Sequence, residues 1–145
     1  MPSERFQNAV KRVPQQTPPI WFMRQAGRYH KHYQALRAKH SFMELCKDPD
    51  LAAAVALGPI EDFDFDVAIL FSDILFPLEA LGLGLTYGDA GPKLEPRLDA
   101  TQIGGLRPLD EALPHLIFQR EAMRKTRALL PAEKSLIGFI GGPWT

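Results

Sequence analysis

The sequence contains one cysteine, Cys46, among its 145 residues. A single cysteine cannot form an intrachain disulfide, so the framework typical of small secreted domains is excluded. No apolar run approaches the roughly 18 to 20 residues that a membrane-spanning helix needs, and the N-terminal residues lack the apolar stretch of a signal peptide. We therefore expect a soluble, cytoplasmic protein without a membrane partner.

An excess of charge of either sign is also missing. Lys and Arg together number 17, as do Asp and Glu, so the formal net charge is +0. This balance gives no support for a nucleic-acid partner, which would favour a basic excess. Hydrophobic residues make up 46% and charged residues 23%, which predicts a packed core and argues against disorder.

Three short apolar runs predict strands buried on both faces, because each is four or five residues long and rich in β-branched or aromatic residues. Helical spacing separates them, and capping signals predict helix starts at Ser3, at the capping box of Ser41 and Glu44, and at Asp48, which is followed by Pro49. The expected strands are 20–23, 67–71 and 136–140, and the expected helices are 3–13, 29–39, a short one opening at 41–44, 51–63 and 110–130. Glycines and prolines at 83–98 predict an extended excursion with a tight turn around 89–92.

Alternating buried strands and helices indicate an α/β protein with a parallel sheet, either doubly wound or a (β/α)8 TIM barrel. The glycine-rich nucleotide-binding signatures of doubly wound proteins are absent, which favours the barrel. A complete barrel takes about 250 residues. We therefore expect residues 1–145 to be the N-terminal part of a single barrel domain, about three βα units, incomplete at the C-terminus.

The first candidate site lies directly after the first predicted strand, in the segment Arg24-Gln25-Ala26-Gly27-Arg28. Guanidinium groups bind carboxylates or phosphates through paired hydrogen bonds, and the small residues between them allow a ligand to approach the backbone. Arg37, on the following helix, is a third candidate. The alternative is that these arginines are solvated or paired with acidic side chains, but strand ends are where α/β proteins build their sites.

Asp73 ends the second predicted strand and has apolar neighbours. Desolvating an unpaired carboxylate is costly, so this side chain needs partners. It is either a helix cap or a functional acid, and its position at a strand end favours function. The glycines of 138–145 permit close approach of a flat ligand but are a weak signal alone.

The other polar residues favour structural or surface roles. We expect the four histidines to be exposed, with no zinc site, Cys46 to be buried, and the basic residues of 120–127 to form a solvated helix face.

Three segments, PIWFMRQAGRY, VAILFSDIL and GFIGGPWT, resemble the N-terminal signatures of the uroporphyrinogen decarboxylase family, and the resemblance extends from Pro19 to Thr145. It implies a homodimeric (β/α)8 barrel that uses no metal or organic cofactor and removes the four acetate carboxyl groups of uroporphyrinogen III, giving coproporphyrinogen III in haem biosynthesis.

The resemblance also implies roles for individual residues. Asp73, Arg24 and Arg28 would be catalytic, and the tetrapyrrole would be bound by these three with Gln25, Ala26, Gly27 and Arg37. The family often has Leu-Pro-Glu where this chain has His30-Lys31-His32, a change expected to affect only the surface. Its later functional residues have no positions here, so we expect the isolated chain to be inactive or nearly so.

Two alternatives remain at this stage. One is a corrinoid- or thiol-linked methyltransferase of the same superfamily, which would carry zinc in a C-terminal half. The other is a non-catalytic half-barrel that self-associates to cover its strands.

Overall fold

The computed structural model describes residues 3–88, 91–96 and 98–142. Its helices and strands, in chain order, are α1 (Glu4–Val10), α2 (Lys31–Arg37), α3 (Phe42–Lys47), α4 (Pro49–Phe63), β1 (Val67–Ile69), α5 (Phe76–Ala80), β2 (Gly84–Gly88), β3 (Gly91–Glu95), the 3-10 turn η1 (Ile103–Gly105), α6 (Leu109–Ala112), the 3-10 turn η2 (Leu113–Leu116), α7 (Ile117–Leu129) and β4 (Ser135–Ile137). None of the described helices is long and apolar enough to cross a membrane.

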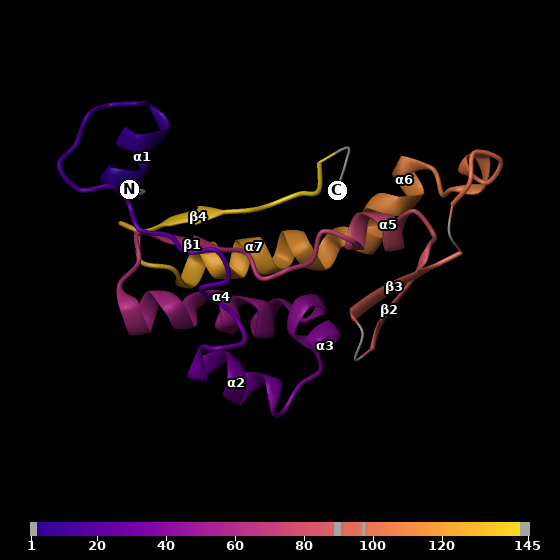
Figure 1. Cartoon of the computed structure of the whole chain (residues 1–145), viewed down its shortest axis with the longest axis horizontal. Helices are drawn as coiled ribbons and strands as arrows, with labels where there is room; N and C mark the ends of the chain where they lie inside the picture. The colour runs from indigo at the N-terminus through magenta and orange to yellow at the C-terminus, as the bar shows by residue number, and fades with distance from the viewer. Residues whose placement is uncertain (1–2, 89–90, 97, 143–145) are drawn as a thin grey trace.

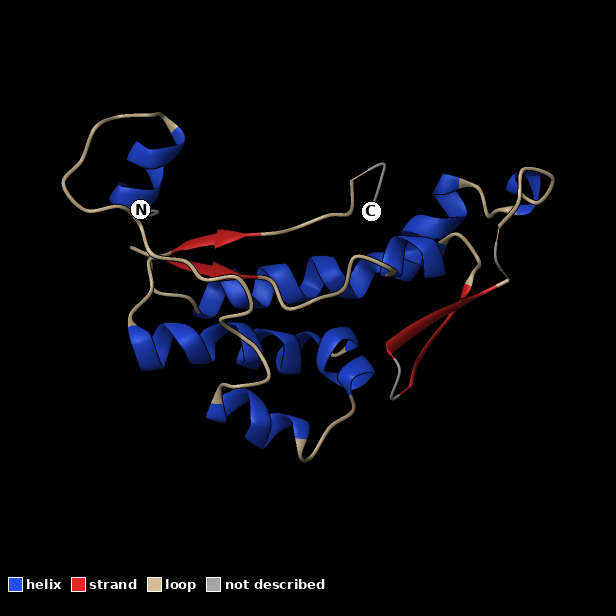
Figure 2. Ribbon diagram, in the orientation of Figure 1, coloured by secondary structure: helices blue, strands red, loops and turns tan. Residues whose placement is uncertain are grey.

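Strands β1 and β4 form a parallel pair in which Val67 lies opposite Ser135 and Ile69 opposite Ile137. Helices α4 and α7 pack against each other and lie on the same side of this pair (Figure 1). Each of these helices precedes one of the two strands, so the chain repeats a helix-then-parallel-strand unit (Figure 2). The predicted α/β class with parallel strands is confirmed.

The strand predicted at Ile20–Met23 does not form, and this prediction was wrong. Ile20 makes two bonds to Asp66, its carbonyl accepting from the backbone N–H (3.1 Å) and its N–H donating to Oδ2 (2.8 Å). The carbonyl of the next residue, Val67, instead accepts from the side chain of Gln25 (2.9 Å). Because a side chain replaces the backbone donor there, the ladder stops, and Phe22 and Met23 remain 58% and 77% exposed.

The predicted capping signals are confirmed. Ser3 accepts the N–H of Phe6 at the start of α1. Ser41 and Glu44 form the reciprocal capping box of α3, and the Asp48 side chain accepts two N–H groups at the start of α4. Such signals act within one helical turn, so they need no distant partner to operate.

Several elements are shorter than predicted. The helix expected at 110–130 is interrupted by η2, which contains Pro114; proline lacks an N–H and clashes with the preceding turn. The helix expected at 3–13 ends at Val10, and the one expected at 29–39 spans Lys31–Arg37. The strands expected at 67–71 and 136–140 are three residues each.

The predicted extended excursion is an antiparallel hairpin of β2 and β3, with Leu85 opposite Leu94. Asp89 and Ala90, within the predicted turn, lie outside the described residues. Leu85 is buried with Cys46 of α3 and Phe76 of α5, and Tyr87 packs against the same cluster. This packing brings the hairpin beside α3, at the opposite end of the molecule from α1 (Figure 1).

Candidate functional site

The segment between Phe22 and His30 is held to the rest of the chain by Gln25. This side chain is fully buried; its Oε1 accepts the N–H of Phe22 (3.1 Å) and its Nε2 donates to the carbonyl of Val67 on β1 (2.9 Å). A buried amide with both ends bonded fixes a loop strongly, because breaking either bond leaves a desolvated polar group. Gln25 therefore fixes the start of the arginine segment to the end of the molecule where β1 begins.

The backbone of the segment is unusually tight around Arg24 and Gly27. Arg24 has a φ of 65°, a left-handed conformation that residues other than glycine rarely adopt. Gly27 is buried, and a Cβ at this position would clash with the carbonyl oxygen of Arg24. Strained backbone of this kind persists where the surroundings hold it and often occurs in ligand sites.

The arginine side chains themselves are accessible. Arg24, Arg28 and Arg37 are all exposed. Arg37 Nη1 donates to the carbonyl of His40 (2.6 Å), and its guanidinium lies near the phenol of Tyr33. Burial raises the pKa of Tyr33, and the positive charge of Arg37 opposes that rise.

Asp73 follows β1 and is partly buried. Its Oδ1 accepts the N–H of Leu75 (2.8 Å), which orients the carboxylate without making it the cap of α5, whose cap position is Leu75. The phenol of Tyr87 lies near this carboxylate: burial, and then Asp73, raise the pKa of Tyr87. The Tyr87 oxygen is itself buried and lacks a well-formed hydrogen bond.

Arg24, Arg28, Arg37 and Asp73 line one cavity of about 1170 Å³, together with Tyr33, Phe42, Tyr87 and residues at both ends of the β2–β3 turn. This volume exceeds the roughly 300 to 1000 Å³ of most small-molecule sites. Its described wall holds three guanidinium groups and one carboxylate. A cavity with this excess of positive charge favours a large ligand that carries several carboxylates.

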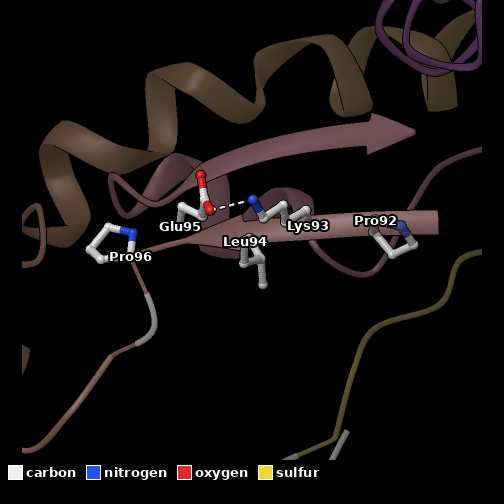
Figure 3. Close-up of a pocket in the computed structure, with 5 residues that line it drawn as sticks. All are labelled: Pro92, Lys93, Leu94, Glu95 and Pro96. Carbon is white, nitrogen blue, oxygen red and sulfur yellow. Dashed lines mark ion pairs between the residues drawn. The ribbon is translucent and has the colours of Figure 1, made fainter. Parts of the chain in front are cut away.

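A second hollow, of about 790 Å³, runs along β3 and is lined by residues 92–96 (Figure 3). Its two charged side chains neutralise each other, since Lys93 Nζ lies 2.5 Å from Glu95 Oε1. The wall comes from one strand and offers no converging polar groups. We therefore assign the candidate site to the larger cavity.

Some predicted site residues do not line this cavity. Gln25 is buried against β1, Ala26 packs against the core of Tyr33, Leu45 and Val55, and Gly27 permits the tight backbone. The sequence analysis did not predict that Tyr87 lines the cavity. The signal that could have indicated it is a tyrosine, which has an apolar ring and a polar tip, within a strand of alternating residues. In the glycine-rich segment, Phe139 and Ile140 are exposed and 143–145 lie outside the described residues.

Three of the four histidines predicted to be exposed are not: His30 is buried and His32 partly buried, both against α4, and His40 is partly buried. His115 is exposed and Cys46 buried, as predicted. The basic residues of 120–127 were predicted to form a solvated helix face. This prediction holds only in part, because Arg127 donates to backbone carbonyls at the end of α7. Across residues 3–88, 91–96 and 98–142, no group of three or more His, Cys, Asp or Glu side chains is placed to hold a metal ion.

A sequence model described as "Uroporphyrinogen decarboxylase (URO-D)" matches residues 1–145. The chain belongs to the uroporphyrinogen decarboxylase family. It is 44% identical to the uroporphyrinogen decarboxylase of Anaeromyxobacter dehalogenans (strain 2CP-C) and 43% identical to that of Myxococcus xanthus (strain DK1622), in each case over 99% of this chain. It spans 43% and 41% of the length of these two proteins.

Among solved structures, the chain is similar to a methyltransferase from Methanosarcina mazei, with a TM-score of 0.73 and 20% identity. The match covers 97% of this chain and 42% of that protein. At this identity the likeness concerns the fold alone. The parallel strands, the family and the share of its members' length together identify the fold as the N-terminal part of a (β/α)8 barrel.

Proposed function

We propose that the cavity binds uroporphyrinogen and that the chain forms the substrate-gripping part of a uroporphyrinogen decarboxylase. The observation that carries this proposal is that Arg24, Arg28, Arg37 and Asp73 line one cavity of about 1170 Å³. The substrate carries acetate and propionate carboxylates around a ring of pyrrole N–H groups. Guanidinium groups suit the carboxylates, and the single carboxylate suits the N–H groups.

The reaction would remove the four acetate carboxyl groups of uroporphyrinogen III in turn, giving coproporphyrinogen III. Protonation of a pyrrole carbon makes the ring cationic. The electrons of the bond to the carboxyl group then flow into the ring, and carbon dioxide leaves. The exocyclic carbon takes a proton to become a methyl group, and the ring loses the proton first added. The pyrrole ring is its own electron sink, so this scheme needs no cofactor.

Asp73 would stabilise the positive charge that develops on the pyrrole. A fixed carboxylate beside a cation is most effective in a cavity that excludes water. Leu75 already orients this carboxylate through its N–H. Arg24 and Arg28 would hold the carboxylates that do not react, because a guanidinium group keeps its protons too tightly to be a good proton donor.

The chain spans less than half the length of its relatives, so turnover is proposed for a complete barrel of which residues 1–145 form the N-terminal part. We expect the chain alone to bind uroporphyrinogen and to decarboxylate it slowly or not at all. An assay of decarboxylation under reducing, dark conditions checks this. Normal turnover by the isolated chain would contradict the expectation that it contains only part of the active site.

Binding is tested by equilibrium dialysis of uroporphyrinogen under the same conditions, with the bound ligand quantified after oxidation to the fluorescent porphyrin. We expect Arg24→Ala and Arg28→Ala each to weaken binding roughly tenfold, since each removes a charge-assisted contact. Arg120→Ala, at an exposed position on α7, is the matched control. Equal affinities in the unmodified chain and its three variants, or no binding by the unmodified chain, would refute the proposal.

We further propose a homodimeric, cytoplasmic enzyme, in line with the family resemblance. Apolar side chains such as Met23 and Ile140 are 77% and 88% exposed, which gives the isolated chain surface to bury by association. Light scattering measures this directly. A stable monomer at high concentration would argue against self-association of these residues.

A further inference from the structure

His30 joins the arginine segment to helix α2. Its backbone N–H donates to the carbonyl of Gly27 (3.0 Å), closing the turn that contains Arg28. Its carbonyl accepts the N–H of Gln34, beginning α2, but its imidazole makes no cap bond to that helix. Only 4% of the residue is exposed. The imidazole is therefore buried against another part of the chain.

That part is the C-terminal end of α4. His30 Nε2 lies 2.6 Å from Oδ2 of Asp62, and because a carboxylate oxygen only accepts, Nε2 carries the proton. The ring also lies 5.2 Å, between centroids, from the ring of Phe63. One polar and one apolar contact therefore fix the residue two positions after Arg28 to a long, packed helix.

A second histidine supports the same contact. The ring of His32 stacks on that of His30 at 5.9 Å, and its Nε2 lies 2.9 Å from the carbonyl oxygen of Ala54. A Cβ at Gly58 would clash with the His32 ring, so α4 accepts this ring only because residue 58 has no side chain. Both histidines thus contact α4, the helix that packs against α2 and lies beside it in Figure 1.

Arg28 lies in a segment that is held at both ends. Gln25 fixes the segment at its start, through Val67, and His30 fixes it at its end, through Asp62. Arg28 lies between them, with its carbonyl accepting from Gln34 Nε2 (2.8 Å) and its side chain lining the cavity. A guanidinium on a segment held at both ends loses less conformational entropy on binding than one on a free loop.

The geometry points to His30 as a positioning residue: its bond to Asp62 holds Arg28 in place for a carboxylate of the ligand. This inference rests on the proposed function for the ligand's identity, but not for the contact itself. The two are tested with different measurements, so that each can fail separately.

The contact is tested by limited trypsin digestion of the native chain, with cleavage after Arg28 followed by mass spectrometry. Asp62 is exposed at the surface, so Asp62→Ala is expected to fold. We expect it to speed cleavage after Arg28 roughly three- to tenfold. This is the change in local opening expected when one hydrogen bond to a partly exposed carboxylate is lost. Cleavage after Arg12, which lies outside this contact, should not change. Equal acceleration of cleavage after Arg28 and after Arg12, or no acceleration of cleavage after either residue, would overturn the inference.

A double-mutant cycle with His30→Leu identifies the partner. In the His30→Leu background, Asp62→Ala should have no further effect, because its hydrogen-bonding partner is gone. An undiminished effect would mean that Asp62 acts through another group. His115→Leu, at an exposed histidine, is the matched control for the substitution.

Dialysis against uroporphyrinogen then tests positioning. Asp62→Ala should weaken binding by a factor similar to its effect on cleavage, with affinity measured under conditions where urea unfolding shows both proteins to be fully folded. Faster cleavage with unchanged affinity would refute positioning. If the unmodified chain binds no uroporphyrinogen while cleavage still depends on His30 and Asp62, the contact stands and the proposed function fails.

Discussion

The Tyr87 phenol lies beside the Asp73 carboxylate, one contributed by strand β2 and the other by the segment after β1. Burial raises the pKa of Tyr87, and the carboxylate raises it further. The phenol oxygen is buried but makes no well-formed hydrogen bond within the described part of the chain. Tyr87 therefore adds a desolvated hydroxyl to the wall of the candidate site, next to its only described acid.

Tyr87→Phe is expected to leave the chain as stable as before or to stabilise it by up to about 1 kcal/mol, because it removes a desolvated group that lacks a bond. Urea unfolding at neutral pH measures the change, with the exposed Tyr29→Phe as the matched control. A loss of stability well above that of the control would show that the hydroxyl donates a bond, with Asp73 the nearest acceptor.

The stability of the chain should fall at alkaline pH, in part because of Cys46. Burial, with a smaller contribution from Asp73, raises the pKa of this thiol above its ordinary value of 9.0. The unfolded chain then releases the thiol proton at a pH where the folded chain keeps it. Stability from this group is complete below pH 9 and decreases as the pH rises further.

Cys46→Ala isolates this contribution. The substitution lowers stability at every pH by removing a buried side chain, but it should make the decline above pH 9 less steep. Urea midpoints at several pH values measure the slope. An identical slope in the two proteins would contradict a raised thiol pKa.

The features predicted correctly from sequence are those decided over a few residues. The capping box of Ser41 and Glu44 and the Asp48-Pro49 start of α4 depend on bonds within one turn. Arg28 and Asp73 line one cavity, but the rule that α/β proteins gather functional groups at strand ends does not account for Arg28, because the strand expected at 20–23 does not form. The roles of these two residues in a functional site stay a prediction.

The errors concern features that depend on distant partners. Ile20–Met23 has the composition of a strand, but Gln25 occupies the carbonyl that a neighbouring strand would use. His30 is polar and was assigned to the surface, yet Asp62 supplies the partner that allows its burial. Tyr87 reaches the site only because its hairpin packs on α3. None of these partners is adjacent in sequence.

Gln25→Leu should destabilise the chain by about 1–3 kcal/mol, since it leaves the buried Val67 carbonyl and the partly buried Phe22 N–H without these partners. Gln16→Leu, at an exposed position, is the control and should have little effect. Urea unfolding compares the two. Equal stabilities would mean that Gln25 does not hold the segment to β1.

Gly27→Ala should also destabilise the chain, by about 1–3 kcal/mol, because the new Cβ meets the carbonyl of Arg24 and the backbone must shift. Gly104→Ala is the matched control, since a Cβ there meets no atom within 4 Å. Uroporphyrinogen affinity should fall in Gly27→Ala beyond the loss of folded protein, as Arg24 moves. Full affinity in the folded fraction would argue against a role for this tight turn in the site.

The central claim is that a polycarboxylate tetrapyrrole occupies the cavity lined by Arg24, Arg28 and Asp73. A crystal structure of the chain grown with uroporphyrinogen under reducing, dark conditions tests it most directly. We expect ligand carboxylates on the guanidinium groups of Arg24 and Arg28, with pyrrole N–H groups facing Asp73. A ring bound along residues 92–96, or elsewhere on the surface with this cavity empty, would contradict it.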